Sequence, residues 1–284
     1  MLVLGGGQIA RAVGAAAPVQ HEVVIRTHAD LDIVDEAALA RALAEVRADW
    51  IVNAAAYTAV DLAEDETAQA IAVNDTAVAL IDRAAAREGS RLLHLSTDFV
   101  FDGESTHAYL PADQTNPLSV YGSSKLGGER HVVAGGAGIV LRTSWVYAAS
   151  GKNFVLTMLR LMKEKDRINV VCDQIGAPTW ATSAAAAIWG LIQVQAAPGI
   201  YHWTDLGVAS WYDFAVAIQD EALARGLLSR AIPISPIYSS EYPTRAKRPP
   251  FSVLDSTRTR SMLKVQATHW RHNLRMMLDE LRAA

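Results

Sequence analysis

Short apolar runs alternate with alanine-rich stretches through the first half of the chain, and this alternation is the strongest constraint on the fold. We expect strands at residues 1–4, 22–26, 50–53, 92–96 and 138–142. The runs are apolar throughout, as is typical of parallel strands covered on both faces. Helices are expected between them at residues 8–16, 36–46, 64–88 and 121–133, the third with a candidate break near Asn74. The pattern predicts βαβ units in a parallel sheet.

The second half has a different character, because prolines punctuate it and the strand-like runs are fewer. We expect helices at 153–165 and 182–195 and extended runs at 168–172 and 200–204. Residues 1–147 are predicted to form a dinucleotide-binding domain, and residues 148–284 mainly a smaller substrate-binding domain. Segments such as 196–206 are expected to return to the first domain. The Pro-, Ser- and Arg-rich stretch 232–256 is predicted to be an ordered loop over the site.

Composition narrows the class of protein. Hydrophobic residues make up 51% of the 284-residue chain and charged residues 20%. No apolar run reaches the ~18 residues of a membrane span, so no membrane partner is expected. A net charge of −4 with dispersed basic residues argues against nucleic acid. The N-terminus lacks the pattern of a signal peptide, which predicts a cytoplasmic protein, and a monomer or homodimer is expected.

A glycine turn directly follows the first expected strand. The run from Gly5 to Ala10 fits G-x-G-x-x-A before a helix. Gly5 allows a tight turn, Gly7 lets the backbone approach a pyrophosphate, and Ala10 permits close helix packing. Gln8 and Ile9 open the helix, whose N-terminal N–H groups attract phosphate. A flexible turn is the alternative, but the position at the start of a βαβ unit favours a cofactor site.

Two further stretches extend this predicted cofactor site. Arg26 ends the second strand, where an NAD enzyme would place a carboxylate on the ribose 2′-hydroxyl. An arginine there suits a 2′-phosphate, so NADPH is preferred and NADH is the alternative; a solvated arginine is the other reading. Asp32, followed by Ile33, either contacts the adenine or caps a helix. Mostly small residues follow the third strand and would let a dinucleotide lie against the backbone: Ala55, Ala56 and Tyr57.

A tyrosine and a lysine four residues apart provide candidate catalytic groups. Tyr121 and Lys125 share a helix face. A neighbouring ammonium is expected to lower the phenol pKa from ~10 toward ~7, at about 4 kcal/mol of differential stabilisation. Such a phenol can protonate a carbonyl oxygen that receives a hydride, and the Thr97 hydroxyl can bind the same oxygen. The alternative for Tyr121 and Lys125 is an ordinary solvent-exposed pair on a helix, and the alternative for Thr97 is a turn that caps a helix.

In combination, these motifs resemble the extended short-chain dehydrogenase/reductases. The matching segments run nearly end to end: 5–10, 52–61, 96–103, 117–122 with Lys125, 142–147, 153–154, 173–179 and 248–255. The resemblance implies an α/β fold with a doubly wound parallel Rossmann sheet and a second, smaller α/β substrate domain. It also implies NADPH- or NADH-dependent reduction of the 4-keto group of dTDP-4-dehydro-β-L-rhamnose. The rivals are reduction of another nucleotide 4-keto-deoxysugar and a non-catalytic NADP-binding regulatory subunit.

The resemblance also implies roles for single residues. Thr97, Tyr121 and Lys125 would be catalytic, and Tyr121 and Lys125 would also hold the cofactor. Thr97 and Asp98 would touch the sugar, and Trp145 would offer it an aromatic face. Further candidates for nucleotide or pyrophosphate contacts are Asn153, Gln174 and Arg248. For Arg248, an ion pair with Asp255 is the alternative.

The chain departs from the family pattern at two places in the first βα unit. The glycine turn is one residue shorter than the usual Gly-x-x-Gly, so the pyrophosphate contact is expected to shift. Some family members dimerise through magnesium held by glutamates, one of them early in the first helix. Here that neighbourhood is residues 11–13, Arg-Ala-Val, without a carboxylate. A single cysteine, Cys172, excludes a multi-cysteine metal site, and no metal is expected.

Overall fold

A six-stranded parallel sheet forms the centre of the larger lobe in this computed structural model, which describes residues 1–265 and 268–283. Its order is β10-β5-β4-β3-β1-β2. The strands are β1 (Leu2–Leu4), β2 (Val24–Arg26), β3 (Trp50–Asn53), β4 (Arg91–Thr97), β5 (Ile139–Thr143) and β10 (Gly199–His202). β1 pairs with both β2 and β3, so the winding direction switches there. Ligands bind outside the carboxyl ends of strands at such a switch point.

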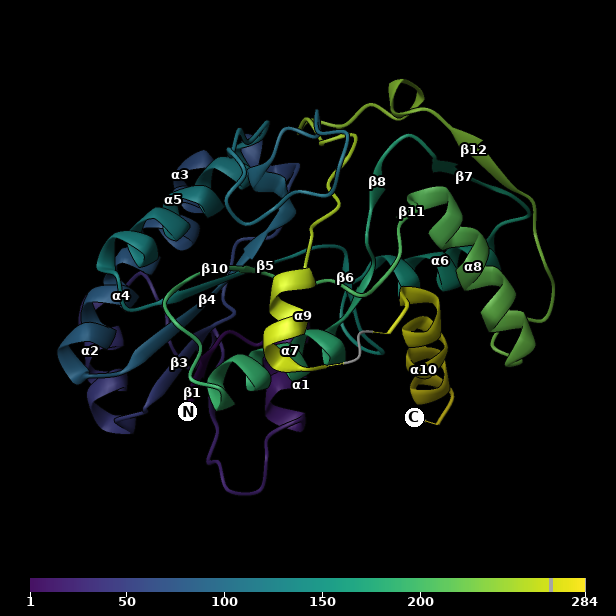
Figure 1. Ribbon diagram of the computed structural model, residues 1–284. Helices are drawn as coiled ribbons and strands as arrows, with labels where there is room; N and C mark the ends of the chain where they lie inside the picture. Colours follow the sequence, from purple (N-terminus) through teal and green to yellow (C-terminus); the bar gives the residue numbers. More distant parts are fainter. Residues whose placement is uncertain (266–267, 284) are drawn as a thin grey trace.

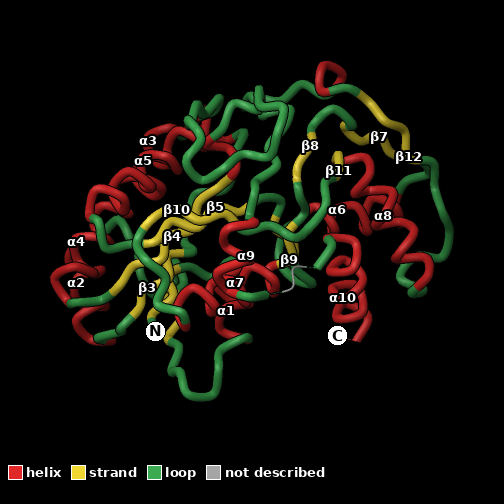
Figure 2. Tube along the Cα trace, viewed as in Figure 1, coloured by secondary structure: helices red, strands yellow, loops and turns green. Residues whose placement is uncertain are grey.

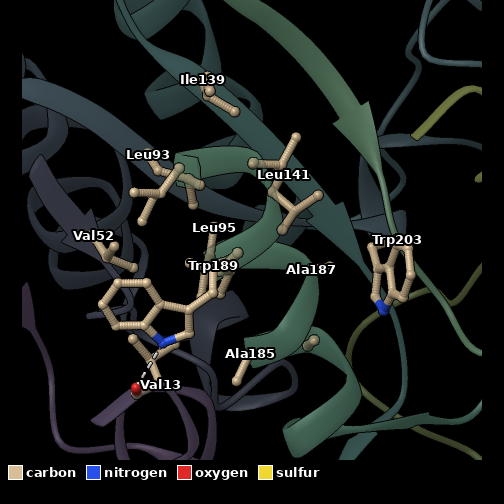
Figure 3. Packing of buried hydrophobic residues seen from close by; sticks show 14 of the residues in the cluster. Val13, Val52, Leu93, Leu95, Ile139, Leu141, Ala185, Ala187, Trp189 and Trp203 are labelled. Atoms are coloured by element: carbon tan, nitrogen blue, oxygen red, sulfur yellow. Dashed lines mark hydrogen bonds between the residues drawn. The ribbon is translucent and has the colours of Figure 1, made fainter. Parts of the chain in front are cut away.

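Helices cover both faces of this sheet, as Figure 1 shows. α2 (Glu36–Val46), α4 (Ala77–Glu88) and α5 (Val120–Gly135) pack on one face. α1 (Gln8–Ala15) and α7 (Ala181–Gln193) pack on the other, with α9 (Thr257–Leu263) against α7. Figure 3 shows Trp189 of α7 over Val52, Leu93 and Leu95, with its indole N–H donating to the Val13 carbonyl at 2.9 Å. The doubly wound α/β fold is thereby confirmed.

The smaller lobe has its own apolar core, built from α6 (Phe154–Glu164), α8 (Trp211–Ala224) and α10 (Trp270–Ala283). Beside these helices, β7 (Ile168–Val171) pairs in parallel with β12 (Ile234–Ile237) (Figure 2). β6 (Val146–Tyr147) pairs with β9 (Thr179–Trp180), and β8 (Ile175–Gly176) with β11 (Ala209–Ser210). The predicted domain boundary at residue 147 stays a prediction, although β10 does return to the large sheet.

Two expected elements differ in the structure. Part of the stretch predicted as a loop, 232–256, forms β12 and the 3-10 turn η4 (Ser239–Glu241). Pro236 is tolerated in β12 because a strand at a sheet edge need not donate every N–H. The helix predicted over 64–88 is divided into η1 (Leu62–Glu64), α3 (Thr67–Ile71), the π-helical turn η2 (Ala72–Thr76) and α4; the candidate break near Asn74 is confirmed, because Asn74 lies inside the π turn. No helix among the described residues is long and apolar enough to cross a membrane.

Candidate active site

The catalytic candidates meet where β4 ends and α5 begins. After β4, the chain turns into η3 (Asp98–Val100), and the Thr97 hydroxyl accepts from the Phe99 N–H at 3.2 Å. Ser119 caps α5 by accepting from the Gly122 N–H at 3.1 Å. Gly122 is required at that position, because a Cβ there would overlap the Phe99 carbonyl oxygen. The close approach puts Tyr121, in the first turn of α5, against the end of β4.

The phenol of Tyr121 is held neutral by its surroundings. Its pKa is raised to about 12, mainly by burial and also by the nearby Asp98 carboxylate, while a hydrogen bond with Thr97 acts in the opposite direction. The expected lowering toward ~7 by Lys125 is therefore wrong for this structure. The Lys125 ammonium does not reach over the phenol but donates to the Leu95 carbonyl at 2.6 Å. A neutral phenol at pH 7 is a proton donor, which is the form a ketone reduction requires.

Lys125 is almost fully enclosed, with 3% of its surface exposed. Burial lowers its pKa to about 8, and the carboxylate of Glu129 acts in the opposite direction. Its Nζ also lies 3.3 Å from Nε2 of His94 on β4. Lys125 is therefore a buried cation whose pKa lies close to neutral pH.

One cavity of about 690 Å³ brings most of the predicted catalytic and sugar-binding residues together. Its lining includes Thr97, Asp98, Tyr121, Lys125 and Trp145. Burial raises the pKa of Asp98 to about 6, although Ser252 and Thr97 hydrogen-bond its carboxyl group. Three buried oxygens lining the cavity have no hydrogen-bond partner among the described residues: Ser96 Oγ, Asp98 Oδ2 and Thr143 Oγ1. Buried polar atoms are normally satisfied, so these three fit the polar groups of a ligand.

An aromatic pair forms another wall of the same cavity. The indoles of Trp145 and Trp211 stack with ring centroids 3.5 Å apart and planes 3° from parallel. Trp145 has a φ of 48°, and Gly176 leaves room for its ring, which a Cβ there would strike. Trp211 opens α8 in the smaller lobe and was not among the residues predicted from the sequence. Only the tertiary fold brings it to Trp145.

A second cavity of about 400 Å³ continues from the first along the glycine turn. Both cavities are lined by Gly7, Ala54, Ala56 and Thr58. The second contains most of the predicted cofactor residues: Gly5, Gly7, Arg26, Asp32, Ile33, Ala55, Ala56 and Tyr57. Gly5 adopts φ 107° and lies so close to the backbone of residues 54–55 that no Cβ fits. Gln8 and Ile9, with Arg11, line the first cavity instead.

The second cavity and the adjoining end of the first, beside Gly7, form a trench along the glycine turn, and this trench fits a bound dinucleotide. The N-cap of α1 is Gly7, which lines both cavities, and within the described chain no side chain caps this end of the helix. Arg11 adds a cation there and donates to the Gly6 carbonyl at 2.5 Å. Arg11 was not among the cofactor residues predicted from the sequence. Its place one turn into α1, after a glycine turn, was the available signal.

The π turn secures the loop after β3. Asn74 accepts from the Tyr57 N–H at 2.9 Å and donates to the Tyr57 carbonyl at 3.0 Å. Its amide also donates to the hydroxyl of Ser124 on α5, at 3.0 Å. Asn74 therefore ties the trench wall to the catalytic helix. Asp32, across the trench, accepts from the Val34 N–H at 3.1 Å and closes a local turn.

The three outer candidates are placed differently. Asn153 lies outside both cavities, where it caps α6 and donates to Gln8 at 2.9 Å. Gln174 lines a neighbouring cavity of about 500 Å³ and donates to Ser239 at 2.9 Å. Arg248 lines both that cavity and the catalytic one. Its ion-pair partner is Asp61, with bonds of 3.0 and 2.6 Å, and not Asp255, whose carboxylate accepts from the Thr257 N–H.

Comparisons with known proteins agree with this geometry. A family model described as the RmlD substrate binding domain matches residues 1–283. A dTDP-4-dehydrorhamnose reductase of Aggregatibacter actinomycetemcomitans is 40% identical over 97% of each chain. One of Burkholderia thailandensis is 40% identical over 99% of this chain and 98% of the relative. The structure of a Bacillus anthracis dTDP-4-dehydrorhamnose reductase in complex with NADP superposes with a TM-score of 0.92 at 30% identity, covering 98% of both chains. The chain therefore belongs to the dTDP-4-dehydrorhamnose reductase family of the extended short-chain dehydrogenase/reductases.

Proposed function

We propose that this protein reduces the 4-keto group of dTDP-4-dehydro-β-L-rhamnose to give dTDP-L-rhamnose, with NADPH as the reductant and NADH as an alternative. The observation that carries the proposal is the single cavity lined by Thr97, Tyr121, Lys125 and Trp145, which joins the trench along the glycine turn. The names of the relatives and the NADP complex of the Bacillus anthracis structure support the same activity.

The trench residues hold the cofactor. The backbone of Gly7 and the N-terminus of α1 receive the pyrophosphate, with Arg11 as an added cation. Arg26 lines the far cavity and binds the 2′-phosphate of NADPH. When bound, the nicotinamide supplies the hydride for C4 of the sugar. Lys125, at the floor of the catalytic cavity, holds the nicotinamide ribose.

The catalytic cavity orients the ketone and supplies the proton. The Tyr121 phenol donates its proton to the carbonyl oxygen, and the Thr97 hydroxyl stabilises the charge that develops on that oxygen. The unpartnered oxygen of Asp98 accepts from a sugar hydroxyl. The stacked indoles of Trp145 and Trp211 pack against the sugar ring and exclude water.

The nucleotide part of the substrate extends into the neighbouring cavity. Arg248 stands between the two cavities, and Arg245 and Lys247 add positive charge to the outer one. Gln174 lines the same outer cavity. Binding energy from this distant part orients the ketone for reaction. A different nucleotide 4-keto-deoxysugar fits the same chemistry and is the second candidate substrate.

A turnover assay tests the proposal. The purified protein is incubated with dTDP-4-dehydrorhamnose and either NADPH or NADH, and the sugar product is identified by NMR. We expect cofactor oxidation that depends on the keto sugar, a faster rate with NADPH, and a rhamnose product. Consumption of other nucleotide 4-keto sugars only would favour the second candidate, and no consumption of any, beside an active family member, would overturn the proposal.

A further inference from the structure

A short chain of buried polar groups lies behind Lys125. Asn53, the last residue of β3, and His94 of β4 are both 0% exposed. Nδ2 of Asn53 is 3.0 Å from Nδ1 of His94, and Nε2 of His94 is 3.3 Å from Nζ of Lys125. Of the two described cavities in the large lobe, neither is lined by Asn53 or His94. Any influence of this pair on a ligand therefore passes through Lys125.

The backbone fixes the orientation of the Asn53 amide. Its Oδ1 accepts from the Ala55 N–H at 3.2 Å, and a backbone N–H can only donate. Nδ2 consequently faces His94 and donates to Nδ1. Burial holds the pKa of His94 well below its ordinary value, so the ring is neutral and carries one proton. Since Nδ1 accepts, that proton is on Nε2, the nitrogen that faces Lys125.

Two donors would meet if Lys125 were an ammonium in this arrangement. A neutral amine, in contrast, accepts the Nε2–H with its lone pair and still donates to the Leu95 carbonyl at 2.6 Å. We infer that His94 is a positioning residue whose Nε2–H donates a hydrogen bond to Lys125 whenever its amine is neutral, in an orientation that Asn53 fixes, and that this bond favours the neutral form over the ammonium.

The ionisable groups on the elements around Lys125 have other neighbours or line the catalytic cavity. Glu129, one turn further on α5, binds Arg142 of β5 through bonds of 2.8 and 2.7 Å. Asp75 of the π turn is 2.7 Å from His131. Asp98 of η3 and Tyr121 of α5 act on each other across the catalytic cavity. His94 is thus the buried neighbour whose Nε2, with its fixed proton, faces Lys125.

Gly128 allows the contact to form. A Cβ at this position would be 3.3 Å from Nε2 of His94 and would overlap the Asn74 carbonyl oxygen, so α5 lies directly on β4.

The functional consequence rests on the proposed function. Because the bond from His94 stabilises the neutral amine, it lowers the pKa of Lys125, and the cation that holds the nicotinamide ribose is lost at a lower pH than for an ordinary lysine.

The test measures the titration of Lys125 in the protein without substrate. The protein is labelled with 13Cε-lysine, the Lys125 signal is assigned by its loss in Lys125→Arg, and its midpoint is followed by NMR. In His94→Gln the side-chain carbonyl can turn toward Lys125 and accept from the ammonium. We expect the midpoint to rise by about one pH unit or more, a tenfold change in the proton equilibrium.

His202→Gln is the matched control. His202 is equally buried, but it contacts Arg142 at 3.3 Å and the Tyr109 carbonyl at 3.0 Å. Its replacement should leave the Lys125 midpoint unchanged. A rise of equal size in both variants, or no rise in a folded His94→Gln protein, overturns the inference.

Asn53→Asp provides a second route if His94→Gln does not fold. A carboxylate accepts from both the Ala55 N–H and Nδ1–H of His94, so the proton moves to Nδ1 and Nε2 can accept from the Lys125 ammonium. The midpoint should again rise, and an unchanged midpoint contradicts the inference. Because no substrate is used, failure of the proposed reduction leaves this result unaffected.

Discussion

At the scale of single residues, burial dominates the chemistry of the site. The sequence correctly brought Thr97, Tyr121 and Lys125 together, because motifs at the end of a strand and the start of a helix have local signatures. It gave the wrong direction for the Tyr121 pKa, because that direction depends on how much protein surrounds the phenol. It missed Trp211, since the contact with Trp145 joins residues far apart in the chain.

The raised pKa of Asp98 predicts a pH dependence of stability. Its folded-state pKa is about 6 against an ordinary 3.8, so the folded protein binds more protons than the unfolded one between these values. Stability contributed by Asp98 therefore falls as pH rises from about 4 to about 6, by up to ~3 kcal/mol. Asparagine at position 98 cannot ionise, so Asp98→Asn does not lose this stability. Urea unfolding should therefore show that the free energy of unfolding of Asp98→Asn, relative to that of the wild type, increases between pH 4 and pH 8.

Asp205→Asn is the control for this prediction. Burial also raises the pKa of Asp205 to about 6, but its carboxylate accepts from the Trp180 N–H and lies outside the catalytic cavity. Both variants should gain stability at high pH, and only Asp98→Asn should raise the KM for the keto sugar. Parallel pH profiles for the wild type and Asp98→Asn would contradict the account.

At the scale of elements, α5 is placed by its glycines. Gly128→Ala would push a methyl group into the backbone carbonyl of Asn74 and against His94. We expect a loss of about 1–3 kcal/mol in the free energy of unfolding, typical of overpacking against groups that cannot move away. Chemical denaturation measures this loss.

Gly135→Ala is the matched change in the same helix. A Cβ at Gly135 would meet the carboxylate of Asp82, which sits at the end of a side chain that can rotate away. Alanine also has a better helix propensity than glycine by about 1 kcal/mol. Gly135→Ala should therefore cost much less than Gly128→Ala, and equal losses would mean that the contact with Asn74 is not what limits the approach of α5.

The elements themselves were predictable to different degrees. The strands and helices of the first half follow from apolar runs and alanine-rich stretches, and the structure contains them within a few residues. The pairings β7·β12, β6·β9 and β8·β11 were not predictable, because strands of two to four residues carry little pattern of their own. Their partners are fixed by packing in the smaller lobe.

At the scale of the whole molecule, an ion pair joins two segments far apart in the sequence. Arg248 and Asp61 form a two-pronged pair at the edge of the catalytic cavity. The pair is part-exposed, with 22% and 43% of the side chains accessible, so it contributes at most about 1 kcal/mol to stability. Asp61→Asn should leave the unfolding free energy almost unchanged and raise the KM for the keto sugar several-fold, with kcat little affected.

Asp279→Asn removes a comparable pair in the smaller lobe. Asp279 binds Arg225 at 2.9 Å, with 53% and 15% of the side chains exposed, and lies away from both cavities. Its KM should match that of the wild type in steady-state assays. An unchanged KM in Asp61→Asn would show that Asp61 does not position Arg248 for the substrate.

The central claim is that Tyr121 supplies the proton for reduction in the cavity built by β4 and α5. The most direct test is kcat of Tyr121→Phe, measured beside its affinity for NADPH and its thermal stability. We expect kcat to fall about 100-fold or more, with the NADPH Kd within about twofold of the wild type and the fold retained. A folded Tyr121→Phe protein that reduces the keto sugar at the wild-type rate would contradict this claim.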